Sequence, residues 1–401
     1  MVSWLLLAIS TISIFSDVTT ASASDQCLGV DQRLLLLELR NSLVFNASES
    51  SKLVQWDQSA NSWSGVTCED GLVVGLDLSE ESISGGIDDS SNLFRLEFLR
   101  SLNLAFNAFY TVAILSSLAN LSRLAHLNLS NAGFAGQIPV ELSCLTKLHT
   151  LDLSWAGLKL EKPDMRSLIG DLRELRELYL DGVNMFACGN EWCDVLSSSV
   201  PKLEVLSMSS CSLSGPINAS LMSLANLLVI QLDGNNLSAT VPSSLSNFSN
   251  LKTLSLWGAG LHGEFPHEIF QVQTLQTLDL SSNSLHGSLP EFSKNNSLQT
   301  LVLSDTDMSG RLPDSIDTMR VTLKGVKLEF VKILTMFKLI DFSSNGLAGP
   351  IPDTLGDLKL LHVLNLSHNA LSGSIPPVLG NLGQLESLDL SRNYLNGTKL
   401  A

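Results

Sequence analysis

The chain has 401 residues, of which 44% are hydrophobic but only 6% are aromatic, and its formal net charge is −16. Binding to nucleic-acid phosphates requires clustered Lys and Arg, so this charge balance excludes a nucleic-acid-binding role. A large apolar share with few aromatic rings predicts a narrow core filled mainly by leucine.

The first residues have the pattern of a secretory signal. An interrupted apolar stretch runs from Trp4 to Phe15, and Ala21 and Ala23 form a small-residue cleavage site. We therefore expect residues 1–23 to be a signal peptide. Because no later segment is apolar for the roughly 18 residues that a bilayer span needs, the mature chain is predicted to be exported and soluble.

Residues 24–71 are predicted to form an N-terminal cap. A leucine-rich helix is expected to begin near Asp31, and Cys27 and Cys68 lie on either side of it. Exported chains use disulfides freely, so a bridge between these two cysteines would staple the first exposed end of the fold.

A short phrase then recurs along the chain, as in AHLNLSNAGFAGQIP, QTLDLSSNSLHGSLP and HVLNLSHNALSGSIP. A period of about 20 to 29 residues with the pattern LxxLxLxxNxL is typical of a leucine-rich-repeat solenoid. The second apolar residue of each LxL, here called the anchor, occurs thirteen times: Leu78, Leu104, Leu129, Leu153, Leu180, Met208, Leu232, Leu256, Leu280, Leu303, Phe342, Leu366 and Leu390. The interval is near 24 residues, with longer intervals of 27, 28 and 39.

This period predicts an α/β solenoid that curves as a right-handed superhelix, with a parallel β-sheet on its concave face. In each strand Leu278 and Leu280, for example, would point inward while Asp279 and Ser281 face the concave surface. Three residues after the anchor, an Asn amide is expected to satisfy backbone groups at the turn. The residues in this slot are Asn107, Asn235, Asn283, Asn345, Asn369 and Asn393.

The repeats also contain recurring aspartates and three cysteines, and each set could be structural or functional. Five acids share the slot before the anchor, namely Asp77, Asp152, Asp279, Asp341 and Asp389. We interpret them as a solvated face rather than a binding site.

Cys211 occupies an Asn slot. Either it is a buried turn cysteine or it forms a disulfide bridge to Cys193. Cys144 is expected to be a buried thiol.

Nine NxS/T sequons fit an exported chain, although several arise from the repeat phrase itself. The candidate N-glycosylation sites are Asn46, Asn120, Asn128, Asn218, Asn236, Asn247, Asn295, Asn365 and Asn396.

Motifs for catalysis are missing from the sequence. His267 and Glu268 begin an HExxH pattern, but position 271 is Gln, so the second zinc ligand is lacking. His262 and His286 take the same position in neighbouring repeats, where surface turns explain them better than a metal pair. We therefore expect neither an enzyme nor a metal site nor a cofactor.

The segment WSGVTC, Trp63 to Cys68, followed by repeats that read LxGxIP, resembles plant leucine-rich-repeat receptor-like proteins of the Cf type and the Verticillium-resistance type. The resemblance covers essentially the whole chain. It implies a ligand-sensing ectodomain that has no kinase of its own and recruits a co-receptor leucine-rich-repeat kinase. It also implies an apoplastic location, or the plasma membrane if a transmembrane helix follows in the full-length product.

Three departures from the family pattern accompany this resemblance. Asn61 and Ser62 stand where the family's cap carries a further cysteine pair. After a first block of repeats at 72–316, the irregular segment 317–337 resembles the stretch that follows the family's island domain, which implies a missing block. The second block, 338–401, stops inside a repeat, which indicates a shortened paralogue, a splice product or an incomplete gene model.

A recognition strip is predicted on the concave face, where repeats offer variable side chains over a rigid core. Exposed aromatic and charged residues are typical interface material, and the acids would suit a ligand with Lys or Arg. The strip consists of Phe106, Trp155, Arg176, Tyr179, Asp181, Asp233 and Trp257. The alternative explanation is random sequence variation on a concave face that binds no ligand.

The sequence thus predicts an extracellular module that recognises a peptide, a protein or an oligosaccharide derived from a pathogen or a cell wall, in defence or development. Two other functions remain open. The chain could be a secreted inhibitor of a fungal wall-degrading enzyme, similar to polygalacturonase-inhibiting proteins, or a signalling-dead decoy or truncated receptor fragment.

Overall fold

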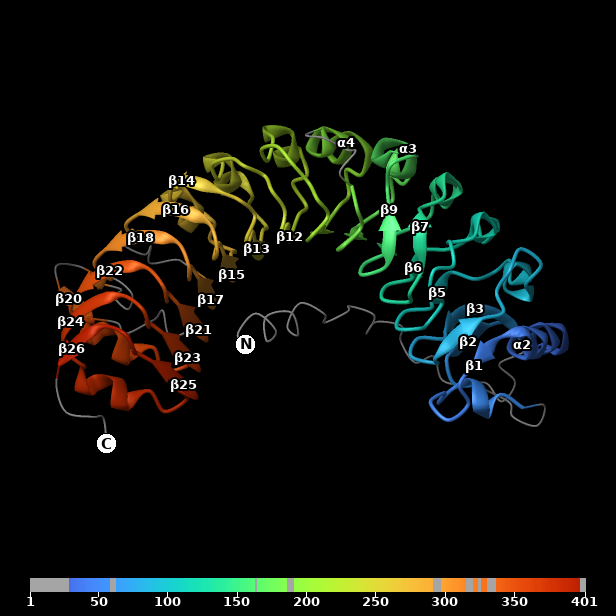
Figure 1. Ribbon diagram of the computed structural model, residues 1–401, viewed down its shortest axis with the longest axis horizontal. Coiled ribbons are helices and arrows are strands. Elements are labelled where there is room, and N and C mark those ends of the chain that lie inside the picture. The colour runs from blue at the N-terminus through green and yellow to red at the C-terminus, as the bar shows by residue number, and fades with distance from the viewer. Residues whose placement is uncertain are drawn as a thin grey trace.

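The thirteen predicted strands pair side by side in one long sheet. The computed structural model describes residues 29–57, 63–162, 164–185, 191–290, 297–314, 320–323, 326–329 and 337–396. The sheet lines the concave side of a curved solenoid, and short helices line the convex side (Figure 1). Its strands are β3 (Leu72–Asp77), β5 (Ser101–Asn103), β6 (His126–Asn128), β8 (Thr150–Asp152), β10 (Glu177–Tyr179), β11 (Val205–Ser207), β12 (Val229–Gln231), β13 (Thr253–Ser255), β15 (Thr277–Asp279), β17 (Thr300–Val302), β21 (Leu339–Asp341), β23 (Val363–Asn365) and β25 (Ser387–Asp389).

The cap helix predicted near Asp31 is present as α2 (Val30–Ser42), whose Leu36 and Leu39 are buried. Strand β2 (Val66–Glu69) pairs antiparallel with β3 and extends the long sheet at the cap, while β1 (Val44–Phe45) pairs with β4 (Ile83–Gly85). Cys68 is disulfide-bonded. Cys27 and the whole signal-peptide segment lie outside the described residues, so the bridge to Cys27 stays a prediction.

A second sheet, which we did not predict, follows the turn after the long sheet. It contains β14 (His262–Glu264), β16 (Ser284–Gly287), β18 (Asp307–Gly310), β22 (Gly346–Gly349), β24 (Ala370–Ser374) and β26 (Tyr394–Asn396), and β7 (Ala135–Gln137) pairs with β9 (Gly157–Lys159) in the same way. The LxG part of the phrase is therefore strand, and the Ile-Pro part follows after the strand ends, as at Ile138 and Ile375. In its register His286 lies opposite Glu264 and not opposite His262.

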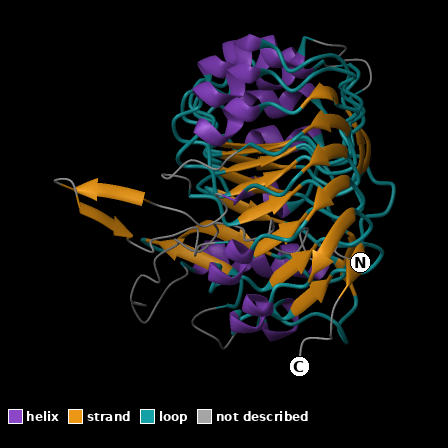
Figure 2. Ribbon diagram, turned by 90° about the vertical axis from the view of Figure 1, so that its left-hand side faces the viewer, coloured by secondary structure: helices purple, strands orange, loops and turns teal. Residues whose placement is uncertain are grey.

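Within the described residues, short helices on the convex side close most of the repeats. Most are single turns, because the segment between two sheets is short. They are η3 (Asn92–Arg95), η4 (Ser116–Asn120), η5 (Val140–Cys144), α3 (Met165–Ile169), α4 (Trp192–Ser199), η7 (Ala219–Ser223), η8 (Ser243–Asn247), η9 (His267–Gln271), η11 (Asp353–Asp357) and η12 (Pro377–Asn381), and a further turn, η2 (Leu53–Gln55), belongs to the cap. A separate antiparallel pair, β19 (Arg320–Leu323) and β20 (Val326–Glu329), lies within the predicted irregular segment and projects from the solenoid (Figure 2).

Leucines of the LxL pattern form the core, as predicted. Leu278 and Leu280 are completely buried, and the same positions repeat along the stack. No single repeat could cover these side chains, so stability arises mostly from the interfaces between neighbouring repeats. In the last repeat, by contrast, Leu388 is 36% exposed.

The Asn slot links consecutive repeats through hydrogen bonds, as expected. Asn369 Nδ2 donates to the carbonyls of Phe342 (2.8 Å) and Leu366 (3.1 Å), and its Oδ1 accepts from the backbone N–H of Leu347 (3.0 Å). The two anchors belong to neighbouring repeats, so one buried amide satisfies backbone groups in both.

Cys211 uses this slot in the same way, which corrects the proposed bridge to Cys193. Both residues are thiols. Cys211 Sγ donates to the carbonyl of Leu180 at 2.9 Å, and Cys193 Sγ accepts from the N–H of Asn218 at 3.2 Å. Burial raises the pKa of Cys193 to about 12, which keeps this thiol protonated. Cys144 is exposed rather than buried.

The shared aspartate slot is not a uniformly solvated face. Asp279 and Asp341 are buried, and each accepts a hydrogen bond from the backbone N–H two residues later, on Ser281 and Ser343. Burial raises the pKa of Asp152 and of Asp279. These carboxylates stabilise the turn after the strand, which explains why they recur.

We expect Asn369→Ala to lower the free energy of unfolding by about 1–3 kcal/mol, because buried carbonyls in two repeats lose their donor. The exposed Asn226→Ala is the matched control and should change stability little. Urea denaturation followed by circular dichroism measures both. Equal effects of the two substitutions would contradict a linking role for the Asn slot.

Candidate functional site

The position two residues after each anchor has a left-handed backbone in all thirteen repeats. Its φ lies between +50° and +76°, as at Asn131 and Gly182. This conformation suits glycine and costs an ordinary L-residue roughly 1–2 kcal/mol. The occupants are Glu80, Phe106, Asn131, Trp155, Gly182, Ser210, Gly234, Gly258, Ser282, Asp305, Ser344, His368 and Arg392.

Two bulky aromatic residues occupy this strained position. Phe106 is 53% exposed and Trp155 is 50% exposed. Neither the backbone nor the core benefits from a large exposed ring here, so these residues point to a role outside folding.

Neighbouring repeats position the tryptophans of the strip. The ring of Trp155 lies against Gly182, where a Cβ atom would come within 3.2 Å of its Cε3. Trp257 is 41% exposed, and its Nε1 donates to Ser282 Oγ at 3.1 Å. Both rings therefore present a fixed surface to the concave side.

Two carboxylates lie between these rings along the stack. Asp181 accepts from Ser207 Oγ (2.8 Å) and from the N–H of Ser209 (2.6 Å). Asp233 accepts from Ser255 Oγ (2.6 Å) and from the N–H of Trp257 (2.8 Å). This last bond couples the second carboxylate to the second tryptophan.

Both carboxyl groups have a raised pKa, and burial is the main cause. It raises the pKa of Asp181 to about 6, with a further contribution from Asp152, and the pKa of Asp233 to about 6, with contributions from Asp279 and Asp181. Burial also raises the pKa of the half-buried Tyr179, so its phenol stays neutral and offers a hydrogen bond. The strip can therefore gain negative charge near neutral pH.

Arg176 lies apart from the other strip residues. It precedes β10, at the opposite edge of the sheet from the Phe106 and Trp155 positions. Its Nη1 pairs with Glu204 Oε1 at 2.5 Å. The guanidinium charge is thus already compensated, and we remove Arg176 from the strip.

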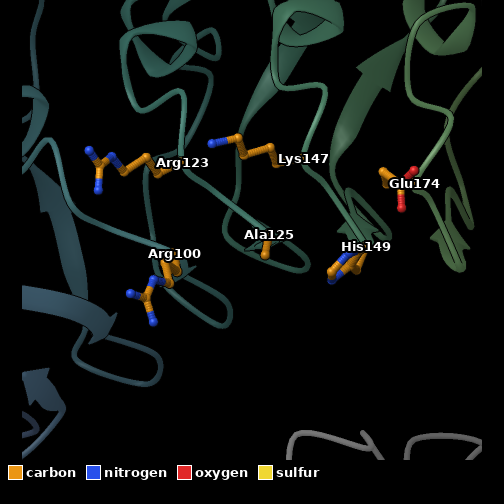
Figure 3. Close-up of a pocket in the computed structure, with 6 residues that line it drawn as sticks. All are labelled: Arg100, Arg123, Ala125, Lys147, His149 and Glu174. Carbon is orange, nitrogen blue, oxygen red and sulfur yellow. The ribbon is translucent and has the colours of Figure 1, made fainter. Parts of the chain in front are cut away.

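A group of basic residues near this edge was missed from the sequence. Arg100, Arg123, Lys147 and His149 line a cavity of about 330 Å³ together with Ala125 and Glu174 (Figure 3). Their common offset of four or six residues before successive anchors is the signal that could have revealed them.

The described sequons differ in exposure. Asn128 is buried, and its Oδ1 accepts from the N–H and the hydroxyl of Ser130, so in the folded chain it is not an accessible glycosylation site. Asn365 is half-buried, and Asn295 lies outside the described residues. The exposed sequons are Asn46, Asn120, Asn218, Asn236, Asn247 and Asn396.

The described part of the chain offers neither a metal-binding cluster nor a membrane-spanning helix. No cluster of three or more His, Cys, Asp or Glu side chains there could hold a metal ion. Across the same ranges, no helix combines the length and apolarity that crossing a membrane requires.

Known sequences resemble this chain over part of its length. Residues 338–395, 202–224 and 274–296 match leucine-rich-repeat families. Receptor-like protein 6 of Arabidopsis thaliana is 31% identical over 241 residues, which is 52% of this chain and 23% of that protein. Receptor-like protein Cf-9 of Solanum pimpinellifolium is 30% identical over 222 residues, covering 49% of this chain and 24% of that protein.

Solved structures are similar to this chain over a larger part of its length than the known sequences are. The Arabidopsis receptor kinase HAESA, crystallised with the peptide hormone IDA and the co-receptor SERK1, is 26% identical with a TM-score of 0.76 and covers 92% of this chain and 62% of that one. The ectodomain of GASSHO1/SCHENGEN3 from Arabidopsis thaliana, in complex with CASPARIAN STRIP INTEGRITY FACTOR 2, is 30% identical with a TM-score of 0.65 and covers 91% and 47%. The predicted solenoid and the resemblance to plant receptor-like proteins are both confirmed.

The raised pKa values of Asp181 and Asp233 predict a pH-dependent stability. In the folded chain both carboxyls keep protons up to about pH 6, whereas in the unfolded chain they release them near the ordinary value of 3.8. Their contribution to stability is therefore full below about pH 4 and is lost as pH rises through 6.

The double variant Asp181→Asn, Asp233→Asn should flatten this part of the pH profile. Urea midpoints of the wild type and the variant between pH 4 and pH 7 would test it, with the exposed Asp353→Asn as a control. Parallel profiles for the wild type and the double variant would contradict the assignment.

Proposed function

We propose that this chain is an extracellular ligand-recognition module of a plant receptor-like protein, which binds through the concave strip and carries out no catalysis itself. The strip, as revised by the structure, consists of Phe106, Trp155, Tyr179, Asp181, Asp233 and Trp257. The ligand would be a peptide or a molecule derived from a pathogen or a cell wall. A co-receptor kinase would be the signalling partner.

One observation carries the proposal: bulky aromatic rings occupy exposed positions whose left-handed backbone penalises them. In the repeats beyond β13, the corresponding residues are Ser282, Asp305, Ser344, His368 and Arg392, none of which is Phe, Tyr or Trp. Large aromatic side chains that are exposed and held in place are typical anchors of binding interfaces. The similar structures support the same role, since HAESA was crystallised with the peptide hormone IDA and GASSHO1/SCHENGEN3 with CASPARIAN STRIP INTEGRITY FACTOR 2.

Charge defines the ligand further. Asp181 and Asp233 accept hydrogen bonds from neighbouring repeats and lie beside the aromatic rings. When ionised, they would attract a Lys or Arg side chain, and partial burial would strengthen that interaction. A ligand that combines an apolar group with a cationic group therefore fits this surface best.

Trp155→Gly separates binding from folding. Glycine accepts φ of +55° without strain, so we expect the free energy of unfolding of the variant to be unchanged or higher by about 1 kcal/mol at most. Peptides selected by display on the wild-type chain should nevertheless bind the variant at least about tenfold more weakly, as expected for loss of an aromatic anchor. Calorimetry measures the affinity and thermal unfolding the stability.

Tyr110→Ala is the matched control, because Tyr110 is 75% exposed but lies outside the strip. It should leave peptide affinity unchanged. If Trp155→Gly also left affinity unchanged, the strip would be drift on an unused face. A loss of stability in the glycine variant would contradict the strain argument.

Binding of cationic peptides should also depend on pH. Between pH 5 and pH 7 Asp181 and Asp233 lose protons around pH 6, so the affinity for a Lys- or Arg-containing peptide should rise across this range. The variant Asp181→Asn, Asp233→Asn should show no such rise. A pH-independent affinity of the wild type for these peptides would overturn the role given to the carboxylates.

A further inference from the structure

The basic cavity near the N-terminal end of the solenoid interrupts an otherwise acidic molecule. The chain has a net charge of −16, yet residues 98–140 contain Arg100 and Arg123 and no Asp or Glu. Lys147 and His149 follow in the next repeat. Positive charge is therefore concentrated on the turns that lead into β5, β6 and β8.

Side-chain size creates the cavity. Arg100, Ala125 and His149 take the same position, four residues before three successive anchors, and Figure 3 shows Ala125 between the two longer side chains. Arg123, Lys147 and Glu174 form a second row above them, six residues before their anchors. The small methyl group of Ala125 leaves an open hollow of about 330 Å³ between the longer side chains.

Much of the positive charge in this cavity is uncompensated. In the described part of the chain, no carboxylate lies within ion-pair distance of Arg123 or Lys147. Arg123 instead stacks on the ring of Phe98 at 4.5 Å. Arg100 pairs with Glu69 at 2.8 Å, but both side chains are more than half exposed, and such a pair contributes little stability.

The single acid of the cavity does not offset these charges. Both carboxylate oxygens of Glu174 accept from Lys202 Nζ, at 2.7 and 2.6 Å. This contact is the main cause that lowers the pKa of Glu174, while His149 in the cavity and Arg176 contribute less. The negative charge of Glu174 is therefore compensated mainly by Lys202, which does not line the cavity. Arg123 and Lys147 consequently present positive charge that no carboxylate of the described ranges compensates, and Arg100 adds a guanidinium that it shares with the exposed Glu69.

We propose that this cavity binds an acidic peptide segment in an extended conformation. Guanidinium groups bind carboxylates through two parallel hydrogen bonds, and the cations here come from three successive repeats stacked about 4.8 Å apart. Carboxylates on one face of an extended peptide recur every 6 to 7 Å or so, which long Arg and Lys side chains can follow.

The apolar parts of an acidic peptide also match the apolar groups that line the cavity. The methyl group of Ala125 and the aliphatic stems of Arg123 and Lys147 are apolar, and the methylene groups of Glu side chains match them. This site is separate from the concave strip and does not depend on it.

The test uses a short synthetic peptide that alternates Glu and Ser, and a control peptide that alternates Gln and Ser. The wild-type chain should bind the Glu peptide with an affinity that falls as salt rises, and it should not bind the Gln peptide. The double variant Arg123→Gln, Lys147→Gln should bind at least about tenfold more weakly. Ala125→Leu should also weaken binding, because it fills the cavity with the residue that the chain itself carries in this position as Leu228.

Two controls separate this site from general charge effects and from the proposed function. Lys252→Gln with Lys338→Gln removes the same charge from exposed positions outside the cavity and should leave binding unchanged. Trp155→Gly should leave it unchanged as well. The proposal is overturned by equal binding of both peptides, by unchanged binding in Ala125→Leu, by an equal loss in the lysine control, or by a preference for inorganic sulfate or a carboxylated oligosaccharide over the Glu peptide.

Discussion

The whole structure depends on the hydrogen bonds that join one repeat to the next at the turn after each strand. Asn235 illustrates them, because its Oδ1 accepts from the N–H groups of Cys211 and Leu213 while its Nδ2 donates to the carbonyls of Met208 and Leu232. These backbone groups are buried beside the leucine core and would otherwise lack partners. Satisfying them between repeats allows a stack of incomplete units to fold as one body.

This fixed interior leaves the concave positions free to vary. The inward leucines, the Asn slot and the left-handed turn all constrain sequence, whereas the side chain after the anchor has only to fit beside its neighbours. Serine fills that position in several C-terminal repeats, while Asp181, Asp233 and Trp257 occupy it nearer the middle. At some of these positions the two roles overlap, because Asp181 and Asp233 also accept hydrogen bonds from the next repeat.

Much of the fold could be predicted because periodic burial leaves a strong trace in sequence. The thirteen strands, the cap helix and the role of the Asn slot all follow from where leucine and asparagine recur. The second sheet was missed because its short LxGxIP strands lack a clear alternation of apolar and polar residues. The buried aspartates were misread since their burial depends on a hydrogen bond to the following turn, as in Asp279, and not on their own polarity.

The candidate site was predictable only in part, because a sequence offset gives the position of one residue but not its contacts in the neighbouring repeats. Sequence offset from the anchor places a residue on a face, and in this way it identified Phe106, Trp155 and Trp257 as exposed. It does not reveal pairing across repeats, so Arg176 seemed available although Glu204 compensates its charge. The basic cavity was missed for the same cause, because it depends on one small residue, Ala125, between longer side chains of adjacent repeats.

The central claim is that recognition occurs where concave positions depart from the repeat consensus. Photo-cross-linking of display-selected peptides to the glycosylated chain, followed by mass spectrometry, tests it most directly. The account predicts cross-links to the repeats between β5 and β13, concentrated around Trp155 and Trp257. Cross-links confined to the serine-lined repeats from β15 to β25, or to the convex helices, would contradict it.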